Sequence, residues 1–369
     1  MPFSSADGVA WSNGAPVPWP SGFMHAVRVP TGMRLRRANP EKPGLSRKGH
    51  GRGFSYHDER GTKIADPDVV ERIRTLAIPP AWQDVWICPY PNGHIQATGT
   101  DEAGRRQYLY HDDWRTSQDA DKHDRVRRLA RKLPAFREAV DQDLGARGIG
   151  RDKVLAVALR MLDYGVFRTG NTKYAEEYGS RGAATLLRDD VKVQRGRVVF
   201  DFVAKGGIDR KLELEDDRLV RAVRSLKRGR HDNVRLLVYR DGSSYQEIDA
   251  GMINERFHAL VGEDYTVKDL RTWTATVHAA VDLAQADPPS TKKALNAAVK
   301  EMLAEVSGHL GNTPTVARAS YVDPRVVDQY ERGRTIPDTI EDVDDLDDPE
   351  TRAEVERSVS KLLDQDARE

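Results

Sequence analysis

Five polar residues with the chemistry to bind or transfer an anionic group are spread over residues 168–321 of the sequence. Three are cations: Arg168 in GVFRTGNTKY, Lys205 in FVAKGG and Arg271 in VKDLRTW. The other two, Asn312 and Tyr321, stand nine residues apart in GHLGNTPTVARASY. Fixed cations stabilise anionic oxygens, and a tyrosine hydroxyl can form a covalent intermediate. Taken singly, each residue also fits an ordinary role, such as a surface ion pair, a solvated hairpin lysine or a packed tyrosine.

Other familiar sites lack their residues in this sequence. It contains no GxxxxGK[ST] phosphate-binding loop, no HExxH, no EF-hand loop and no Cys/His cluster. Cys88 is the single cysteine, so an internal disulfide is excluded. The glycine-rich segment KGHGRG lacks the strand-then-helix context of a dinucleotide site, and we expect it to be a loop. We therefore expect activity without a metal ion, nucleotide or other cofactor.

The charge distribution favours a polyanionic partner. The 58 basic and 58 acidic residues of the chain cancel, but residues 331–369 hold 14 acidic and only 6 basic residues. The rest of the chain is left with 52 basic against 44 acidic residues. Within it, residues 28–53 contain eight Lys or Arg and one acid, Glu41. A basic body of this kind suits nucleic acid, although charge runs are also common on solvated faces.

The pattern along the chain predicts two folded domains between polar ends. Residues 1–22 are rich in Pro, Gly and Ser and are expected to form a disordered extension. Residues 23–116 show short strands broken by turns, residues 117–330 are mainly helical, and residues 331–369 form an acidic tail.

From the sequence we expect neither a membrane-spanning helix nor a secretory signal. No apolar run approaches the ~18 residues that a membrane-spanning helix needs, and the N-terminus lacks the pattern of a secretory signal, so we expect a cytoplasmic protein. Within the acidic tail, Val355, Val359 and Leu362 keep helical spacing. The tail is therefore expected either to dock as a helix or to shield the basic body.

Local patterns place the candidate residues on expected elements. A helix begins at Pro67 with Asp66 as its N-cap, and strands follow in VWIC, IQATG and RQYLY. RDKVLAVALRMLDYGVF predicts a buried helix just before Arg168, and Arg271 falls at the start of another helix. VVFDFVAK and KLELE flank a turn, which places Lys205 at the tip of a β-hairpin. The predicted fold class is α+β, with a small antiparallel sheet followed by a mainly helical domain that contains a small β-hairpin.

The order of these motifs resembles the catalytic framework of the type IB DNA topoisomerases, in particular their compact bacterial and poxvirus-type members. Arg168, Lys205 followed by glycine, KDLRT, GNTP and SY occur in that order. The segment IPPAWQDVWICPYPNGHIQATGTDEAGRRQYLY resembles the N-terminal DNA-clamping domain of the same family. The resemblance extends from about Met24 to Tyr330. It implies a monomeric clamp on double-stranded DNA that is associated with the nucleoid.

The resemblance also implies a reaction. Supercoiled DNA would be relaxed by transient cleavage of one strand, strand rotation and religation, without ATP or metal. Tyr321 would attack the phosphorus and form a 3′-phosphotyrosyl intermediate. Arg168 and Arg271 would bind the non-bridging phosphate oxygens, and Lys205 would protonate the leaving 5′-oxygen.

Asn312 departs from the commoner family pattern, in which a histidine donates to a non-bridging oxygen. An Asn amide can donate the same hydrogen bond but carries no charge, so the role survives and its pH dependence weakens. His309 is close enough in the sequence to substitute, but we expect it to end the preceding helix instead.

Further DNA contacts are implied by the same resemblance. RRQYLY matches the family's major-groove strand, in which Gln107, Tyr108 and Tyr110 contact bases or phosphates. A half-buried strand explains the same alternation, because one of its faces has to be core. The remaining expected contacts are Arg105, Arg106, Lys173, Tyr174 and Lys268.

Two other functions stay open at this point. A tyrosine recombinase uses the same chemistry, but typically has HxxR where this chain has KDLR at residues 268–271, and it needs helices for synapsis. A DNA-binding clamp without activity is the other alternative, and the five chemically competent residues argue against it. Relaxation of supercoiled plasmid in EDTA separates the three, because a clamp does not relax it and a recombinase needs its own sites.

Overall fold

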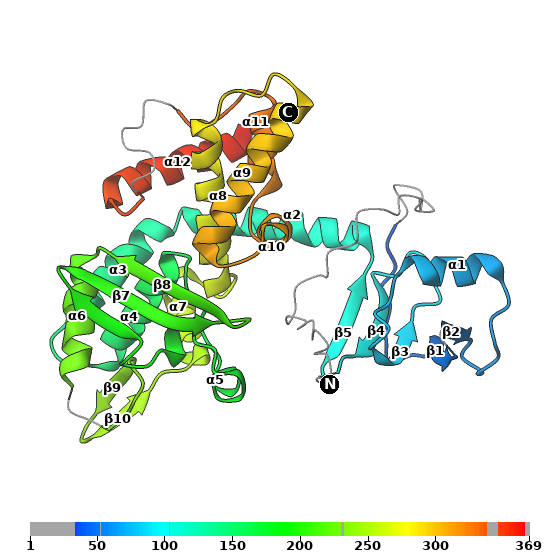
Figure 1. The fold of residues 1–369 in the computed structure, drawn as a ribbon, viewed down its shortest axis with the longest axis horizontal. Helices are drawn as coiled ribbons and strands as arrows, with labels where there is room; N and C mark the ends of the chain where they lie inside the picture. Colours follow the sequence, from blue (N-terminus) through cyan, green and yellow to red (C-terminus); the bar gives the residue numbers. More distant parts are fainter. Residues whose placement is uncertain (1–33, 52, 103, 230–231, 338–345, 366–369) are drawn as a thin grey trace, which may run out of the picture. The chain divides into compact units, whose positions relative to one another are not determined.

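A computed structural model of the chain describes residues 34–337 and 346–365, apart from residues 52, 103 and 230–231. The chain forms two compact units that divide between Lys122 and His123, within helix α2 (Asp112–Ala130) (Figure 1). The boundary expected from the sequence, between residues 116 and 117, falls in the same helix. The expected extension, residues 1–22, lies outside the described residues.

The N-terminal unit is built on one antiparallel sheet with strand order β2-β1-β3-β4-β5. Helix α1 packs on one face of the sheet, where Ile73 joins an apolar cluster that includes Ile87 and Ala97. As predicted, α1 begins at Pro67, and the Asp66 side chain caps it by accepting hydrogen bonds from backbone N–H groups of the first turn. The elements are β1 (Leu45–His50), β2 (Gly53–His57), α1 (Pro67–Thr75), β3 (Gln83–Ile87), β4 (Ile95–Thr100) and β5 (Arg106–Tyr110).

The expectation of a loop at KGHGRG is wrong. The segment belongs to a β-hairpin in which Ser46 lies opposite His57 and His50 lies opposite Gly53. Gly51 supplies the positive φ of the turn, at 57°. Strand β1 also pairs with β3. This pairing with a distant strand stabilises the hairpin, and the local glycine-rich sequence gives no sign of it.

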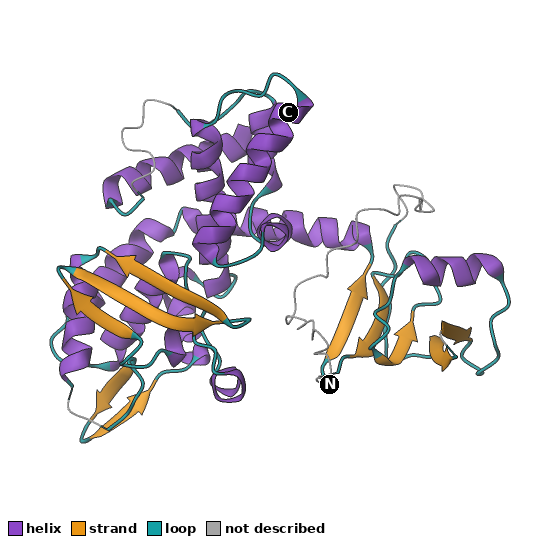
Figure 2. Ribbon diagram, in the orientation of Figure 1, coloured by secondary structure: helices purple, strands orange, loops and turns teal. Residues whose placement is uncertain are grey.

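The C-terminal unit is mostly helical, with small antiparallel sheets of order β6-β7-β8 and β10-β9 (Figure 2). The predicted hairpin is β7–β8, and the predicted buried helix is α4. The elements are α3 (Leu133–Gly145), α4 (Arg151–Asp163), α5 (Thr172–Tyr178), a 3₁₀ turn (Ala183–Thr185), β6 (Val191–Gln194), β7 (Arg197–Ala204), β8 (Ile208–Leu214), α6 (Asp217–Arg228), β9 (Val238–Asp241), β10 (Ser244–Glu247), α7 (Ala250–Val261), α8 (Val267–Gln285), α9 (Lys292–Leu310), α10 (Pro314–Ser320), α11 (Pro324–Glu331) and α12 (Pro349–Gln365). The α+β fold class predicted from the sequence is confirmed.

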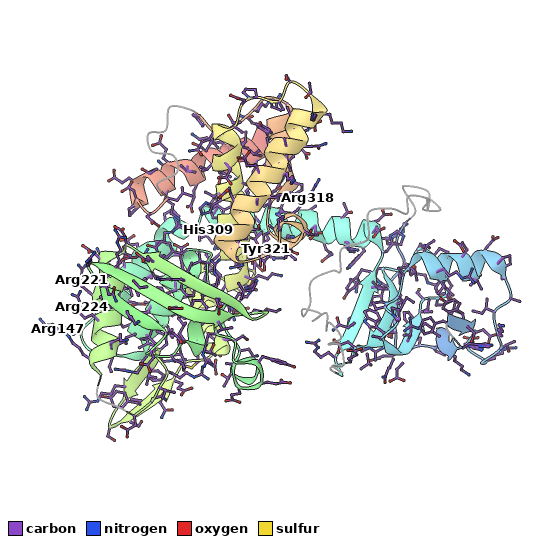
Figure 3. The ribbon with its side chains drawn as sticks, in the orientation of Figure 1. Arg147, Arg221, Arg224, His309, Arg318 and Tyr321 are labelled. Atoms are coloured by element: carbon purple, nitrogen blue, oxygen red, sulfur yellow. The ribbon has the colours of Figure 1, made fainter. Side chains whose placement is uncertain are left out.

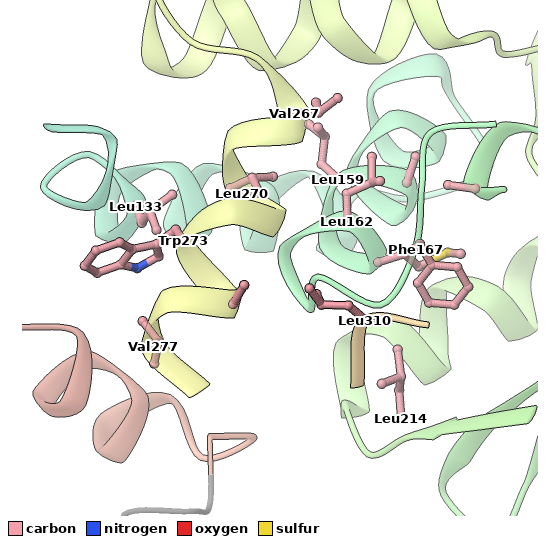
Figure 4. Packing of buried hydrophobic residues seen from close by; sticks show 14 of the residues in the cluster. Leu133, Leu159, Leu162, Phe167, Leu214, Val267, Leu270, Trp273, Val277 and Leu310 are labelled. Atoms are coloured by element: carbon pink, nitrogen blue, oxygen red, sulfur yellow. The ribbon is translucent and has the colours of Figure 1, made fainter. Parts of the chain in front are cut away.

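The core of this unit surrounds α4 and α8. Residues 153–159 of α4 are all buried, so this helix has no solvent face along that stretch. Helix α8 buries Leu270, Trp273 and Val277, which lie three and four residues apart on one side of the helix (Figure 4). Because both helices are fixed in the core, the residues at their ends are held rigidly.

The acidic tail contains a docked helix. Helix α12 packs against α8 and α11, and Val355, Val359 and Leu362 are buried, as is Leu363. Of the two alternatives for the tail, docking is the one that the structure contains for residues 349–365. Residues 338–345, which hold several of the acids, lie outside the described part of the chain.

Candidate active site

The C-terminal end of α9 is the point on which the candidate residues converge. Gly311 ends the helix in the left-handed conformation, at φ 62°, and the Asn312 N–H donates back to the Ser307 carbonyl at 2.9 Å. A helix end leaves its last carbonyls without helical partners and carries partial negative charge, so it attracts cations.

Arg271 reaches this helix end from the first turns of α8. Its buried guanidinium donates to the Gly165 carbonyl at 2.5 Å and to the Leu310 carbonyl, and lies 3.4 Å from Asn312 Oδ1. Arg168, in the loop after α4, donates to the same Oδ1 at 2.7 Å. Asn312 therefore accepts through Oδ1, and its buried Nδ2 has no hydrogen-bond partner among the described residues.

A third arginine completes the group and was missed from the sequence. Arg210, on β8, donates to the carbonyls of Gly308 and His309 at 2.9 and 2.7 Å. It lines a small pocket together with Arg168, Arg181 and Gly311. The only hint in the sequence is its place five residues after Lys205, in GGIDRK.

These arginines form a cluster of positive charge held by neutral oxygens. Within the described ranges, none of Arg168, Arg210 and Arg271 forms an ion pair with Asp or Glu. Burial and the charge of Arg168 lower the pKa of Arg271 to about 10, and the same two causes lower the pKa of Arg210. Like charges gathered without counterions make an anion site that is ready to bind.

Tyr321 lies beside this cluster, where it ends α10 (Figure 3). The ring is 9% exposed, and its centroid lies 5.3 Å from Arg271 Cζ and 5.9 Å from Lys268 Nζ. Burial alone would raise the pKa of the phenol, but the charges of Arg271, Lys268 and Arg168 outweigh burial and lower it. The Tyr321 carbonyl lies 3.4 Å from the hydroxyl of Thr276 on α8, which ties the end of α10 to the core.

Lys205 is the candidate that these contacts do not include. It begins the turn between β7 and β8 and is exposed. The next two residues, Gly206 and Gly207, both have positive φ, at 85° and 73°. Because glycine has no side chain, the two residues after Lys205 contribute only backbone to the turn.

Comparison with known proteins agrees with this arrangement. Residues 111–343, more than half of the chain, match the family described as eukaryotic DNA topoisomerase I, catalytic core. Residues 53–101 match the N-terminal domain of bacterial DNA topoisomerase IB. The chain belongs to the type IB DNA topoisomerases. It is an enzyme of the isomerase class that acts on DNA, and the recombinase alternative gains no support.

Two relatives show the extent of the similarity. The chain is 25% identical to DNA topoisomerase 1B of Acanthamoeba polyphaga mimivirus over 295 residues, which are 78% of this chain and 88% of the viral protein. It is 24% identical to DNA topoisomerase 1 of Daucus carota over 159 residues, which are 42% of this chain and 19% of the plant protein.

In this type IB topoisomerase, the described contacts of His309 are with Tyr164 and His278. His309 is the penultimate residue of α9, as the sequence led us to expect, and its Nε2 lies 3.0 Å from the Tyr164 carbonyl. Its ring centroid is 4.0 Å from that of His278 on α8. Burial is the main cause that lowers the pKa of both imidazoles, so both are neutral near pH 7.

The residues expected on the DNA-facing strand divide into two groups. Tyr108 and Tyr110 are exposed and stack with ring centroids 6.0 Å apart, while Leu109 between them packs into the core. Arg106 shares their face of β5 and donates to Thr98 Oγ1 at 3.3 Å.

The second group on this strand is held by Asp101. Gln107 Nε2 and Arg105 Nη2 both donate to Asp101 Oδ2 at 2.8 Å. The hydrogen bond from Arg105 is the main reason why the pKa of Asp101 falls to about 2. Of the remaining expected contacts, Lys173 and Tyr174 lie on α5, and their side chains are outside the described part of the structure.

Membrane-spanning helices and clusters of metal ligands are both absent from the described residues. No helix there has both the length and the apolar character to cross a bilayer. No group of three or more His, Cys, Asp or Glu side chains there could hold a metal ion.

Proposed function

We propose that the enzyme relaxes supercoiled DNA by cleaving one strand through Tyr321, allowing rotation and then rejoining the strand, with no need for ATP or metal. The observation that carries the proposal is the cluster of guanidinium groups beside Tyr321, which neutral oxygens hold together without a carboxylate. A phosphodiester supplies the missing negative charge.

In the cleavage step, the Tyr321 oxygen attacks the phosphorus, a new P–O bond to tyrosine forms, and the P–O5′ bond breaks. The phenol gives up its proton to solvent water as it attacks, a loss favoured by its lowered pKa. Lys205 gives a proton to the leaving 5′-oxygen, so charge and protons balance. Religation is the same step in reverse, and the phosphotyrosyl bond conserves the energy that ATP would otherwise supply.

Arg168, Arg271 and Asn312 act on the non-bridging oxygens of the scissile phosphate. Charge on these oxygens grows in the transition state, and donors that are fixed in advance stabilise it best. Asn312 suits this role because its Nδ2 is buried and unpartnered while two arginines orient the amide through Oδ1. Lys268, close to the Tyr321 ring, adds positive charge at a DNA phosphate.

The N-terminal unit supplies the remaining DNA contacts in this proposal. Tyr108, Tyr110 and Arg106 form an exposed aromatic and basic strip that fits a DNA groove and its phosphates. Gln107 and Arg105, which donate hydrogen bonds to Asp101 in this structure, donate to DNA instead when it binds. A monomer that clamps double-stranded DNA in the nucleoid, with Lys173 and Tyr174 on further phosphates, completes the function.

The experiment is denaturant trapping of protein on DNA labelled on the 3′-phosphate side of the cleaved bond. Wild type is expected to carry the label on Tyr321. Tyr321→Phe keeps the ring and removes only the nucleophile, so it should lose the adduct and bind DNA within about threefold of wild type. Tyr330→Phe is the matched control, because Tyr330 is a buried tyrosine of the same unit whose hydroxyl donates to the Asp287 carbonyl.

The control variant should still form the adduct. An adduct that survives Tyr321→Phe would refute the assignment of the nucleophile. Failure of wild type to form any adduct would favour the inactive clamp.

A further inference from the structure

Arg210 is held through two backbone carbonyls at the end of α9. Its two terminal nitrogens donate to consecutive carbonyls in the last turn of α9, those of Gly308 and His309. Arg271 takes the next one, the Leu310 carbonyl. The end of α9 is thus capped by side chains from β8 and α8, which satisfy carbonyls that the helix itself leaves open.

The Arg210 guanidinium also packs on Gly311. A Cβ atom on Gly311 would lie 3.1 Å from Arg210 Cζ and Nη1, so a larger residue here would push the guanidinium away by a few tenths of an ångström. Both terminal nitrogens of Arg210 donate to carbonyls of one helix end, and one side of the guanidinium packs against the chain. Its contacts fix protein against protein.

What Arg210 fixes is the outer end of the β7–β8 hairpin. Arg210 pairs with Phe202, and two pairs further along the hairpin Ala204 pairs with Ile208, directly before the turn that starts at Lys205. The two glycines of the turn offer no side chains to pack. The backbone that carries Lys205 is therefore continuous with the ends of the two strands, and anchoring these strands helps to fix its position.

Three described contacts anchor this end of the hairpin. The Arg181 N–H donates to the Val203 carbonyl at 2.7 Å, and Phe202 stacks on Phe167 with centroids 5.7 Å apart. Arg210 is the third, and it alone among these contacts reaches the turn that carries Asn312. One side chain thereby joins the segment of the proposed proton donor to the segment of the proposed oxyanion donor.

We propose that Arg210 is a positioning residue that holds the β7–β8 hairpin, which carries Lys205, against the end of α9, so that Lys205 and Asn312 contact the same phosphate. We call this contact of Arg210 with the Gly308 and His309 carbonyls the latch. The inference rests on the proposed role of Lys205 as proton donor. A shift of about 1 Å in a positioned group costs up to about 100-fold in rate. Loss of the latch should therefore slow proton donation more than it weakens DNA binding.

The test compares single-turnover cleavage of ordinary DNA with cleavage of DNA whose leaving 5′-oxygen is replaced by sulfur. A thiolate leaves without a proton, so this substrate bypasses the proton donor. Arg210→Ala should cleave ordinary DNA about 10- to 100-fold slower than wild type, and the sulfur substrate within about threefold of wild type. Arg271→Ala should be slow on both, because its proposed targets are the non-bridging oxygens.

Two further variants control for general damage. Arg197→Ala removes an arginine from the open end of the same sheet, where it pairs with Glu213 and Glu215, and should match wild type on both substrates. Arg210→Lys keeps the charge and can donate to one of the two carbonyls, so it should fall between wild type and Arg210→Ala. Far-ultraviolet circular dichroism and DNA affinity verify that each variant is folded.

The outcomes separate the latch from the underlying function. Equal defects of Arg210→Ala on both substrates, with Lys205→Ala rescued by sulfur, would overturn the latch and leave the proposed function standing. Fully additive losses in the Lys205→Ala/Arg210→Ala double variant on ordinary DNA would also overturn it. If Lys205→Ala is itself not rescued, both the proton donor and the latch fail, while the Tyr321 adduct remains an independent measure of the covalent chemistry.

Discussion

Helix α12 is held to the catalytic unit by a buried group of four charges, and removing one of them has a measurable consequence. Glu356 accepts hydrogen bonds from Arg137 at 2.7 and 2.8 Å and from Arg352 at 3.3 Å. Both arginines also contact Asp163, the last residue of α4, at 2.8 and 3.1 Å. Burial would raise the pKa of Asp163, but Arg137 and Arg352 hold it below its usual range. The four charges cancel.

Glu356→Ala leaves two largely buried arginines facing a single carboxylate. Removing one partner of a buried ionic group costs about 3–5 kcal/mol, mainly because the remaining charge has lost its compensation. A typical domain is stable by about 5–15 kcal/mol, so the loss is a large fraction of the total. Glu354→Ala removes the same charge from the exposed face of α12 two residues away, and should change stability by no more than about 0.5 kcal/mol.

Urea unfolding followed by helical circular dichroism measures both variants. The expected result is a clearly lower midpoint for Glu356→Ala and a wild-type midpoint for Glu354→Ala. Cleavage should slow in Glu356→Ala as well, because Tyr164 and Gly165 follow directly after Asp163. The Tyr164 carbonyl contacts His309, and the Gly165 carbonyl accepts a hydrogen bond from Arg271. Equal midpoints for the two variants would refute the reasoning and return the tail to the role of a solvated shield.

Two further predictions concern histidine. Asn312→His should keep cleavage activity near pH 8 but add a fall in rate below about pH 7 that wild type lacks, measured as a pH–rate profile of single-turnover cleavage. Burial lowers the pKa of His278 and His309 in the folded state below the ordinary histidine pKa of about 6.5. Just below pH 6.5, the unfolded chain therefore binds more protons than the folded protein does. Unfolding free energy should therefore decrease as the pH falls through 6.5, and His278→Leu should flatten that decrease in urea titrations between pH 5 and pH 8.

The elements that position the site could be predicted where the local sequence determines them. Asp66–Pro67 marks the start of α1, apolar spacing marks α4, and the glycines after Lys205 mark the β7–β8 turn. The β1–β2 hairpin could not be predicted in this way. None of its strand residues is buried, two are glycines, and β1 pairs with β3, whose partner residues lie about forty residues further along the chain.

The site itself was only partly predictable. Motif order and family resemblance named Arg168, Arg271, Asn312 and Tyr321, and the structure brings these four together. Their roles, and that of Lys205, stay predictions. Arg210 could not be found because an arginine followed by lysine in a strand is typical of an exposed position, and its partners are backbone carbonyls about 100 residues away.

The cluster of guanidinium groups also explains why an amide is suited to position 312. In the proposed mechanism, the side chain there accepts hydrogen bonds from Arg168 and Arg271 while it donates to the phosphate, and an amide does both at every pH. A histidine does both only as the neutral imidazole, because the imidazolium has no acceptor and adds another positive charge to the cluster. In the proposed mechanism, Asn312 therefore removes the titration, and charge stabilisation falls to Arg168 and Arg271, which the loop after α4 and helix α8 hold at one helix end.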